Sequence, residues 1–140
     1  MSGTTESIRD NFRKAYPDDL ILVYKYATPG GCGHFYGTKL LETKVENGQW
    51  LKAFKLRRSE GPHMNSDIIK AKAFPFVYDT RSITNDLIRR DRLSASLANI
   101  FPDHNVNVFI FNNTWSRSCC SKGSAAFKNE YGSTIDIVLS

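Results

Sequence analysis

Two groups of basic side chains are the residues best suited to bind anions, because lysine and arginine neutralise phosphates and carboxylates. The first group follows an alternating stretch and comprises Lys52, Lys55, Arg57 and Arg58. The second lies in a segment with helical spacing and comprises Arg89, Arg90 and Arg92. Side chains alternate between the two faces of a strand, so Lys52 and Lys55 point to opposite faces. Only the end of the stretch, where Arg57 and Arg58 lie, can therefore bring positive charges together. Both groups are predicted to contact nucleic acid or an acidic macromolecular partner.

These basic residues also have a purely structural interpretation. A net charge of +5, from 19 basic and 14 acidic residues, favours an anionic partner but also suits a small soluble domain. Asp86 and Asp91 can pair with neighbouring arginines along a solvated helix face. The run from Lys55 to Arg58 is the part that this interpretation explains least.

Soft ligands of the kind that zinc prefers are present at Cys32, His34, Cys119 and Cys120. The usual spacing of about two to four residues between paired cysteines is absent. The three cysteines are an odd number, and a bridge between adjacent cysteines would be strained. The pattern therefore favours free thiols, with no metal and no other cofactor.

A glycine-rich segment at residues 29–33 could present backbone amides to a phosphate. It lacks the lysine and the serine or threonine of a nucleotide-binding P-loop, so a wide hairpin turn is favoured. The histidines, His34, His63 and His104, lie near predicted turns, and spacing ties no serine or cysteine to them as a nucleophile. No catalytic triad is predicted.

Two short motifs each centre on a tyrosine: Val23-Tyr24-Lys25 and Phe35-Tyr36-Gly37. Together with Asp91 in a later helix and a turn from Pro102 to Asn105, they resemble the paired strands and helix of GIY-YIG nucleases. In that family, tyrosines and a helix-borne acid assemble a site where a divalent ion and an activated water attack a phosphodiester. The resemblance implies that Tyr24, Tyr36 and Asp91 converge on one catalytic cleft. Core packing is the alternative for tyrosines in a strand.

Length and composition indicate one folded domain over residues 1–140. The chain is 41% apolar and 24% charged, close to ordinary globular usage. No apolar run approaches the roughly 18 residues of a membrane span, and Met1 to Ser7 lack the features of a secretory signal. With the odd cysteine count, these features predict a cytoplasmic protein in a reducing compartment.

The elements that must position these residues follow from hydrophobic periodicity. In residues 5–16 apolar side chains recur at every fourth position, which is typical of an amphipathic helix, and Pro17 ends this helix. Residues 20–24 are apolar on both faces, which is typical of a central strand. An extended stretch at residues 34–37 is predicted to pair with it as a hairpin.

A second hairpin is predicted around Asn47-Gly48, because this pair supplies the two positive φ angles of a type I′ turn. Pairing outward from a two-residue turn places Val45 opposite Trp50, Thr43 opposite Lys52 and Leu41 opposite Phe54. In that register Val45, Trp50, Leu41, Phe54 and Leu56 share one apolar face. Glu42, Lys44, Glu46 and Lys55 then face water.

The second half of the chain is predicted to contain one long helix between strands. Ser66 caps a helical turn through Lys70, and a strand follows at residues 73–78, which Pro75 places at an edge or at a bulge. The long helix has Ser82 or Thr84 as its cap and an apolar stripe of Ile83, Leu87, Leu93, Leu97 and Ile100.

The remaining segments are a strand at residues 106–111, a polar loop at 112–124 and an alternating strand at 134–139. The predicted fold class is α+β, a mainly antiparallel sheet with helices packed on one face. Two hypotheses follow. One is a small basic domain that binds nucleic acid or an acidic partner; in composition and size it is similar to viral accessory or structural proteins. The other is a metal-dependent nuclease, in which case a divalent ion is required.

Overall fold

The computed structural model describes residues 5–26, 32–45, 48–112, 115–119, 122–128 and 133–140. In these ranges the order begins with α1 (Thr5–Ala15), β1 (Leu20–Tyr26), β2 (Cys32–His34), β3 (Gly37–Lys44) and β4 (Trp50–Leu56). It continues with α2 (Ser66–Asp79), α3 (Asp86–Ile100), β5 (Val106–Asn112), β6 (Trp115–Cys119), β7 (Ser124–Lys128) and β8 (Ser133–Leu139).

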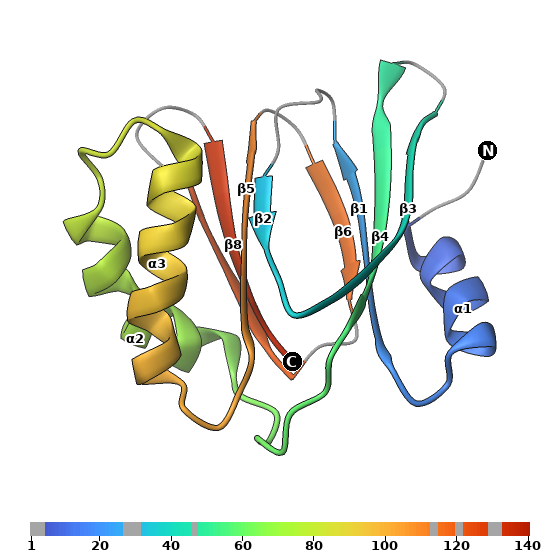
Figure 1. Cartoon of the computed structure of the whole chain (residues 1–140), viewed down its shortest axis with the longest axis horizontal. Helices are drawn as coiled ribbons and strands as arrows, with labels where there is room; N and C mark the ends of the chain where they lie inside the picture. Colours follow the sequence, from blue (N-terminus) through green and yellow to red (C-terminus); the bar gives the residue numbers. More distant parts are fainter. Residues whose placement is uncertain (1–4, 27–31, 46–47, 113–114, 120–121, 129–132) are drawn as a thin grey trace.

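The strands form two antiparallel sheets that lie face to face (Figure 1). The first sheet has the order β3-β4-β1-β6, and the second has the order β2-β5-β8-β7. Helix α1 covers the outer face of the first sheet, and α2 and α3 cover the outer face of the second (Figure 1). The class is α+β, as the sequence predicts. The strands are antiparallel and helices pack on one face of each sheet, also as predicted, but the strands form two such sheets.

Strand β1 is buried on both faces, which is why its sequence does not alternate. Ile21 and Val23 pack against the apolar side of α1, while Leu22 and Tyr24 face the second sheet. Strand β5 is the equivalent strand of the other sheet, with Val108 and Ile110 on its helix-covered face. The predicted helix at residues 5–16 and the predicted strands at 20–24 and 106–111 are confirmed.

The space between the sheets is filled by aromatic and aliphatic side chains. This cluster, called the inter-sheet core below, comprises Leu20, Leu22, Tyr24, Phe54, Leu56, Phe109, Phe111 and Val138. The Tyr24 ring lies 5.1 Å from the Phe109 ring and 4.4 Å from the Phe111 ring, measured between centroids. Each such pair contributes about 0.5–1.5 kcal/mol beyond the area it buries.

A carboxylate also lies in this apolar layer. Asp136 of β8 is fully buried, and its Oδ2 accepts a hydrogen bond of 2.5 Å from the Tyr24 hydroxyl across the two sheets. The alternate residues of β8, including Ile135 and Ile137, face α2 and α3, as predicted from their spacing. A buried carboxylate needs hydrogen-bond donors, so the Tyr24 hydroxyl ties the register of one sheet to the other.

Helix α2 is longer than predicted and replaces the strand expected at residues 73–78. Asn65, not Ser66, caps it, since the Asn65 side chain accepts from the Asp67 N–H at 2.7 Å. Pro75, which would have placed the predicted strand at an edge or a bulge, lies inside the helix. Proline removes one helical hydrogen bond. The apolar face of the helix repeats at every fourth residue, with Ile69, Ala73 and Val77 buried against the second sheet. This burial outweighs the loss of one hydrogen bond.

Helix α3 starts at Asp86 with Asn85 as its cap, one residue after Thr84 and three after Ser82, the two predicted caps. Leu93 and Leu97 of the predicted stripe are buried. Leu87 is 53% exposed, so this part of the stripe is wrong. Arg89 takes the inward position one turn before Leu93.

The polar loop predicted at residues 112–124 is interrupted by strand β6, which pairs with β1 in the first sheet. The hairpin predicted between residues 20–24 and 34–37 is also wrong, because β2 pairs with β5 of the second sheet. In both cases the strand partner lies far away in the sequence, where local turn signals carry no information. The residues 29–31 of the glycine-rich segment lie outside the described residues.

The hairpin of β3 and β4 forms, but one residue out of the predicted register. Glu42 pairs with Lys52, and Leu41 with Ala53. The Val45 N–H donates to the Gln49 carbonyl at 2.7 Å, so the loop encloses three residues, 46 to 48, instead of two. A three-residue loop commonly ends on a left-handed residue, and Gly48 has a φ of +73°. Asn47 lies outside the described residues.

The shifted register separates the side chains predicted to share one face. Leu41 joins the cluster under α1, whereas Phe54 and Leu56 enter the inter-sheet core. Strand β4 is therefore covered on both sides. None of the helices in the described ranges is long and apolar enough to cross a membrane.

Replacing Gly48 with valine is expected to lower the free energy of unfolding by about 1 kcal/mol or more, because a β-branched residue is strained at positive φ. An added Cβ meets no other atom within 4 Å, so the effect isolates backbone strain. The matched control is Gly48→Asn, since asparagine tolerates the left-handed region. Equal thermal unfolding midpoints for the two variants would contradict this assignment of the turn.

Candidate functional site

The chain crosses from the second sheet to the first between β2 and β3. The Tyr36 N–H in this crossing donates to Asn107 Oδ1 at 2.9 Å, and the Tyr36 carbonyl accepts from the Arg57 N–H at 2.8 Å. Asn107 is itself buried, and its amide donates to the Val138 carbonyl at 2.9 Å. These bonds fix β2 at one edge of the second sheet and β3 at the same side of the first (Figure 1).

A cavity of about 300 Å³, called the aromatic cavity below, opens between these two edges. Its lining residues come from both sheets, the crossing and α3: Cys32, Gly33, Phe35, Lys39, Lys52, Phe54, Arg90, Phe109 and Phe111. Phe54 and Phe109 are almost fully buried and form its floor. Phe35 is half-buried, with its ring 4.7 Å from that of Phe54. Phe35 is therefore the aromatic wall that keeps exposed surface.

Gly33 explains how β2 comes so close to this floor. It pairs with Phe109, and a Cβ built on Gly33 would lie 2.5 Å from a ring carbon of Phe109. Any side chain at position 33 would displace the ring. The glycine thus has a packing role within β2, which differs from the hairpin turn predicted from sequence.

Three cations surround the aromatic cavity, each from a different element. Lys39 lies on β3, Lys52 on β4 and Arg90 on α3. Their side chains are 45%, 15% and 19% exposed, respectively. Two of them, Lys52 and Arg90, were singled out from the sequence in separate groups. The structure brings these two together, and adds Lys39, for which no sequence pattern gave a signal.

Each cation also has an acidic neighbour. Glu42 lies 2.8 Å from Lys39 Nζ and 3.2 Å from Lys52 Nζ, and Arg90 forms an ion pair of 2.9 Å with Asp91. The hydrogen bonds from Lys39 and Lys52 lower the pKa of Glu42. A lowered pKa contributes stability that is present above the unfolded-state pKa and is lost as the pH falls through the folded-state pKa. At neutral pH Glu42 is therefore ionised and partly neutralises both lysines.

Cys32 lies on the wall of the aromatic cavity. Burial raises the pKa of its thiol, and the positive charge of Arg90 opposes that shift in part. The thiol rather than the thiolate is the dominant form at neutral pH, and the thiol is the weaker nucleophile. Cys32 therefore contributes a wall to the cavity rather than a reactive group.

The other basic residues singled out from sequence do not join this cluster. Lys55 points to the opposite face of β4 from Lys52, as predicted, and its ammonium lies 4.9 Å from the centroid of the Tyr16 ring. Arg92 is exposed on α3. The predicted basic groups are thus divided between several surfaces.

Arg89 is fully buried, which corrects its assignment to a basic surface. Its guanidinium donates to the Val77 carbonyl at 2.8 Å and to Thr80 Oγ1 at 3.1 Å, both at the C-terminal end of α2. That end of a helix carries unsatisfied carbonyls and the negative end of its dipole. Arg89 therefore joins α3 to α2, and this position keeps it away from any external phosphate.

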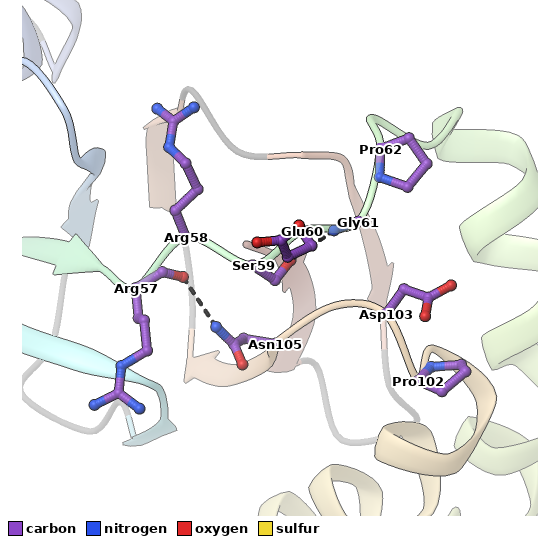
Figure 2. A pocket seen from close by; sticks show the side chains of 9 residues that line it. All are labelled: Arg57, Arg58, Ser59, Glu60, Gly61, Pro62, Pro102, Asp103 and Asn105. Carbon is purple, nitrogen blue, oxygen red and sulfur yellow. Dashed lines mark hydrogen bonds between the residues drawn. The ribbon is translucent and has the colours of Figure 1, made fainter.

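Arg57 and Arg58 line a separate cavity of about 540 Å³, together with Glu60 and Asp103 (Figure 2). The two arginine side chains point in opposite directions from the backbone (Figure 2). The Arg57 carbonyl accepts a hydrogen bond of 3.1 Å from the Asn105 amide, which fixes the chain there. Because the two arginine side chains diverge and Glu60 and Asp103 lie beside them, their charges are not brought together at one point.

The three residues of the nuclease resemblance do not converge. Tyr24 lies in the inter-sheet core, fully buried. Tyr36 and Asp91 line a further cavity, described below, that does not include Tyr24. Core packing, the alternative for Tyr24, is what its ring contacts and its bond to Asp136 show.

Within the part of the chain that the structure describes, no group of three or more His, Cys, Asp or Glu side chains is placed to hold a metal ion. Cys32 and His34 belong to β2. Cys120 lies outside the described residues, as does the side chain of Cys119, so the zinc interpretation of these four residues stays untested. Comparison with protein-family models, with curated proteins and with solved structures finds no match. Function therefore has to be inferred from the site itself.

Removing the Tyr24 hydroxyl by Tyr24→Phe is expected to lower the free energy of unfolding by about 1–3 kcal/mol, because the buried Asp136 carboxylate loses a donor. The control is Tyr36→Phe, at a tyrosine that is 36% exposed, where a change within about 0.5 kcal/mol is expected. Urea unfolding of both variants measures the difference. Equal midpoints would show that the bond between the sheets does not stabilise the fold.

Proposed function

We propose that the domain binds single-stranded nucleic acid at the aromatic cavity. The observation that carries this proposal is the meeting of three cations from β3, β4 and α3 around an aromatic floor. Proteins that bind single strands combine positive charge for the backbone with aromatic side chains for the bases. The cavity supplies both kinds of group within one site.

The size and depth of the cavity favour an unpaired base over a duplex. A volume of about 300 Å³ is at the lower end of small-ligand sites. Bases in a duplex are stacked and paired, so their faces cannot enter a recess of this kind, whereas those of a single strand can be splayed out. The partly exposed ring of Phe35 offers the surface on which such a base stacks, an interaction that contributes about 1–3 kcal/mol.

The charges at the rim fit a phosphodiester. Arg90 presents a guanidinium, which can form two parallel hydrogen bonds to phosphate, and Lys39 and Lys52 present mobile ammonium groups. Because Glu42 and Asp91 compete for these cations, the affinity should be moderate. It should also fall with added salt, because each neutralised phosphate releases counterions. An acidic protein could also reach these cations, but only an aromatic side chain beside its carboxylates would fill the aromatic cavity, whereas every nucleotide carries a planar base next to a phosphate.

The proposal is tested by fluorescence anisotropy with labelled single-stranded RNA and DNA at several salt concentrations. The double variant Lys39→Ala/Arg90→Ala is expected to weaken binding and to reduce the slope of log K against log salt by about 0.7 for each phosphate that the variant can no longer neutralise. The matched control is Arg57→Ala/Arg58→Ala, which removes the same charge from the cavity of Figure 2. This control should bind nearly as the unaltered protein does.

Two results would overturn the proposal. If neither RNA nor DNA binds with salt-dependent affinity, the site does not bind nucleic acid, and an acidic protein becomes the better candidate. If the control double variant loses as much affinity as the cavity variant, binding depends on net charge rather than on the aromatic cavity.

Glu42→Gln is expected to tighten binding to single-stranded RNA by about twofold to fivefold, because it releases two lysines from an exposed ion pair. The substitution reproduces the protonated state, so binding to the unaltered protein should also strengthen as the pH falls through the lowered pKa of Glu42. The charge-matched control is Glu60→Gln, at the cavity of Figure 2. Equal gains for both variants would contradict a specific role for Glu42.

A further inference from the structure

A second cavity, of about 500 Å³, lies beside the aromatic cavity and shares Arg90 with it. Strand β2 runs between them: Cys32 and Gly33 line the aromatic cavity, and His34 lines the second. The polar side chains around this second cavity, called the histidine cavity below, are His34, Tyr36, Arg90, Asp91 and Ser94. A histidine, a tyrosine, a carboxylate and a guanidinium in one open cavity are groups that transfer protons and stabilise charge.

The imidazole of His34 is oriented by two neighbours. Its Nδ1 lies 2.8 Å from Ser94 Oγ, and its ring makes an edge contact with the ring of Tyr36 at 5.5 Å and 82°. When Nδ1–H donates to Ser94 Oγ, Nε2 carries the lone pair and becomes the nitrogen that can accept a proton. Ser94 is only 5% exposed. It therefore serves as a positioning residue and is too buried to act as the nucleophile.

Arg90 determines where a phosphate would lie with respect to His34. Its guanidinium donates to the Gly33 carbonyl at 3.3 Å and is held by Asp91, so the group is anchored on the wall between the two cavities. A phosphate bound there has the aromatic cavity on one side and His34 on the other. Because the two cavities share Arg90, a strand with one base in the aromatic cavity could place its next phosphodiester beside the histidine cavity.

We propose that the histidine cavity cleaves single-stranded RNA without a metal ion, by attack of the ribose 2′-oxygen on the adjacent phosphorus. This activity rests on the proposed nucleic-acid binding and specifies RNA as the substrate class, because DNA lacks the 2′-hydroxyl. His34 Nε2 takes the proton of the 2′-hydroxyl as the general base, and Arg90 neutralises the charge that develops on the phosphate.

The bonds and protons balance without another reactant. The bond from the 2′-oxygen to phosphorus forms while the bond from phosphorus to the 5′-oxygen breaks. The departing 5′-oxygen takes a proton from water, and His34 returns its own proton to the solvent. The products are one strand that ends in a 2′,3′-cyclic phosphate and one that begins with a 5′-hydroxyl.

The test is incubation of the full-length protein with labelled single-stranded RNA in the presence of a chelator, followed by analysis of the product ends. Cleavage to cyclic phosphate is expected, and a DNA strand of the same sequence should stay intact. His34→Ala should lower the rate by about 100-fold or more, as for loss of a general base, with RNA binding retained. The matched control is His63→Ala, at an exposed histidine in the connection before α2, which should cleave at the unaltered rate.

Ser94→Ala should lower kcat with little effect on KM, and Ser94→Thr should restore much of it, because threonine keeps the hydroxyl. If Ser94 had only a structural role, its substitution would change the stability of the protein without a selective loss of kcat in Ser94→Ala and its recovery in Ser94→Thr. Thermal unfolding of each variant verifies that it is folded.

The possible failures are distinguishable. If the protein binds RNA but leaves it intact, the cleavage proposal is overturned and the binding proposal stands. If the protein neither binds nor cleaves RNA, both proposals are overturned. Equal cleavage by the unaltered protein and by His34→Ala identifies a contaminating ribonuclease and overturns the assignment. Cleavage that the chelator abolishes contradicts a metal-free mechanism.

Discussion

The central strands of both sheets are apolar on two sides, and the need to cover all four sheet faces is the constraint on which the rest of the structure depends. The inner faces cover each other through the inter-sheet core. The outer faces are covered by α1 on one sheet and by α2 and α3 on the other (Figure 1). Meeting this constraint in a chain of 140 residues requires the backbone to cross between the sheets repeatedly. The crossing between β2 and β3 is the one that creates the candidate site.

This repeated crossing explains which parts of the fold could be predicted. Periodicity alone identified α1, β1, β5 and β8, because the burial of each is visible within its own residues. It failed for β2 and β6, whose partners lie in distant segments, and for α2, where Pro75 suggested a strand edge. The hairpin of β3 and β4 was found through Gly48, but one additional loop residue moved each pair by one position. A local pattern can specify an element without specifying its partner.

The residues of the candidate site, like the elements of the fold, could be predicted only in part. Lys52 and Arg90 were selected as basic residues, but nothing in their spacing indicates that β4 and α3 bring them to one cavity. Arg89 and Arg90 are adjacent in sequence and about 100° apart around the helix axis. That rotation directs one side chain to the carbonyls at the end of α2 and the other to the boundary between two cavities. Their different roles depend on which side of α3 faces the core, and the predicted apolar stripe was wrong about this side at Leu87.

The polar groups of the molecule are arranged by depth, and this follows from the cost of burying charge. In the inter-sheet core, the carboxyl group of Asp136 accepts a hydrogen bond from the uncharged hydroxyl of Tyr24. At the rim, where water can solvate them, Lys39 and Arg90 keep their charge beside acidic neighbours. A ligand that enters between these levels meets cations at the mouth and aromatic rings below. The proposed ligand, a nucleotide, matches this gradient because it is charged at one end and planar at the other.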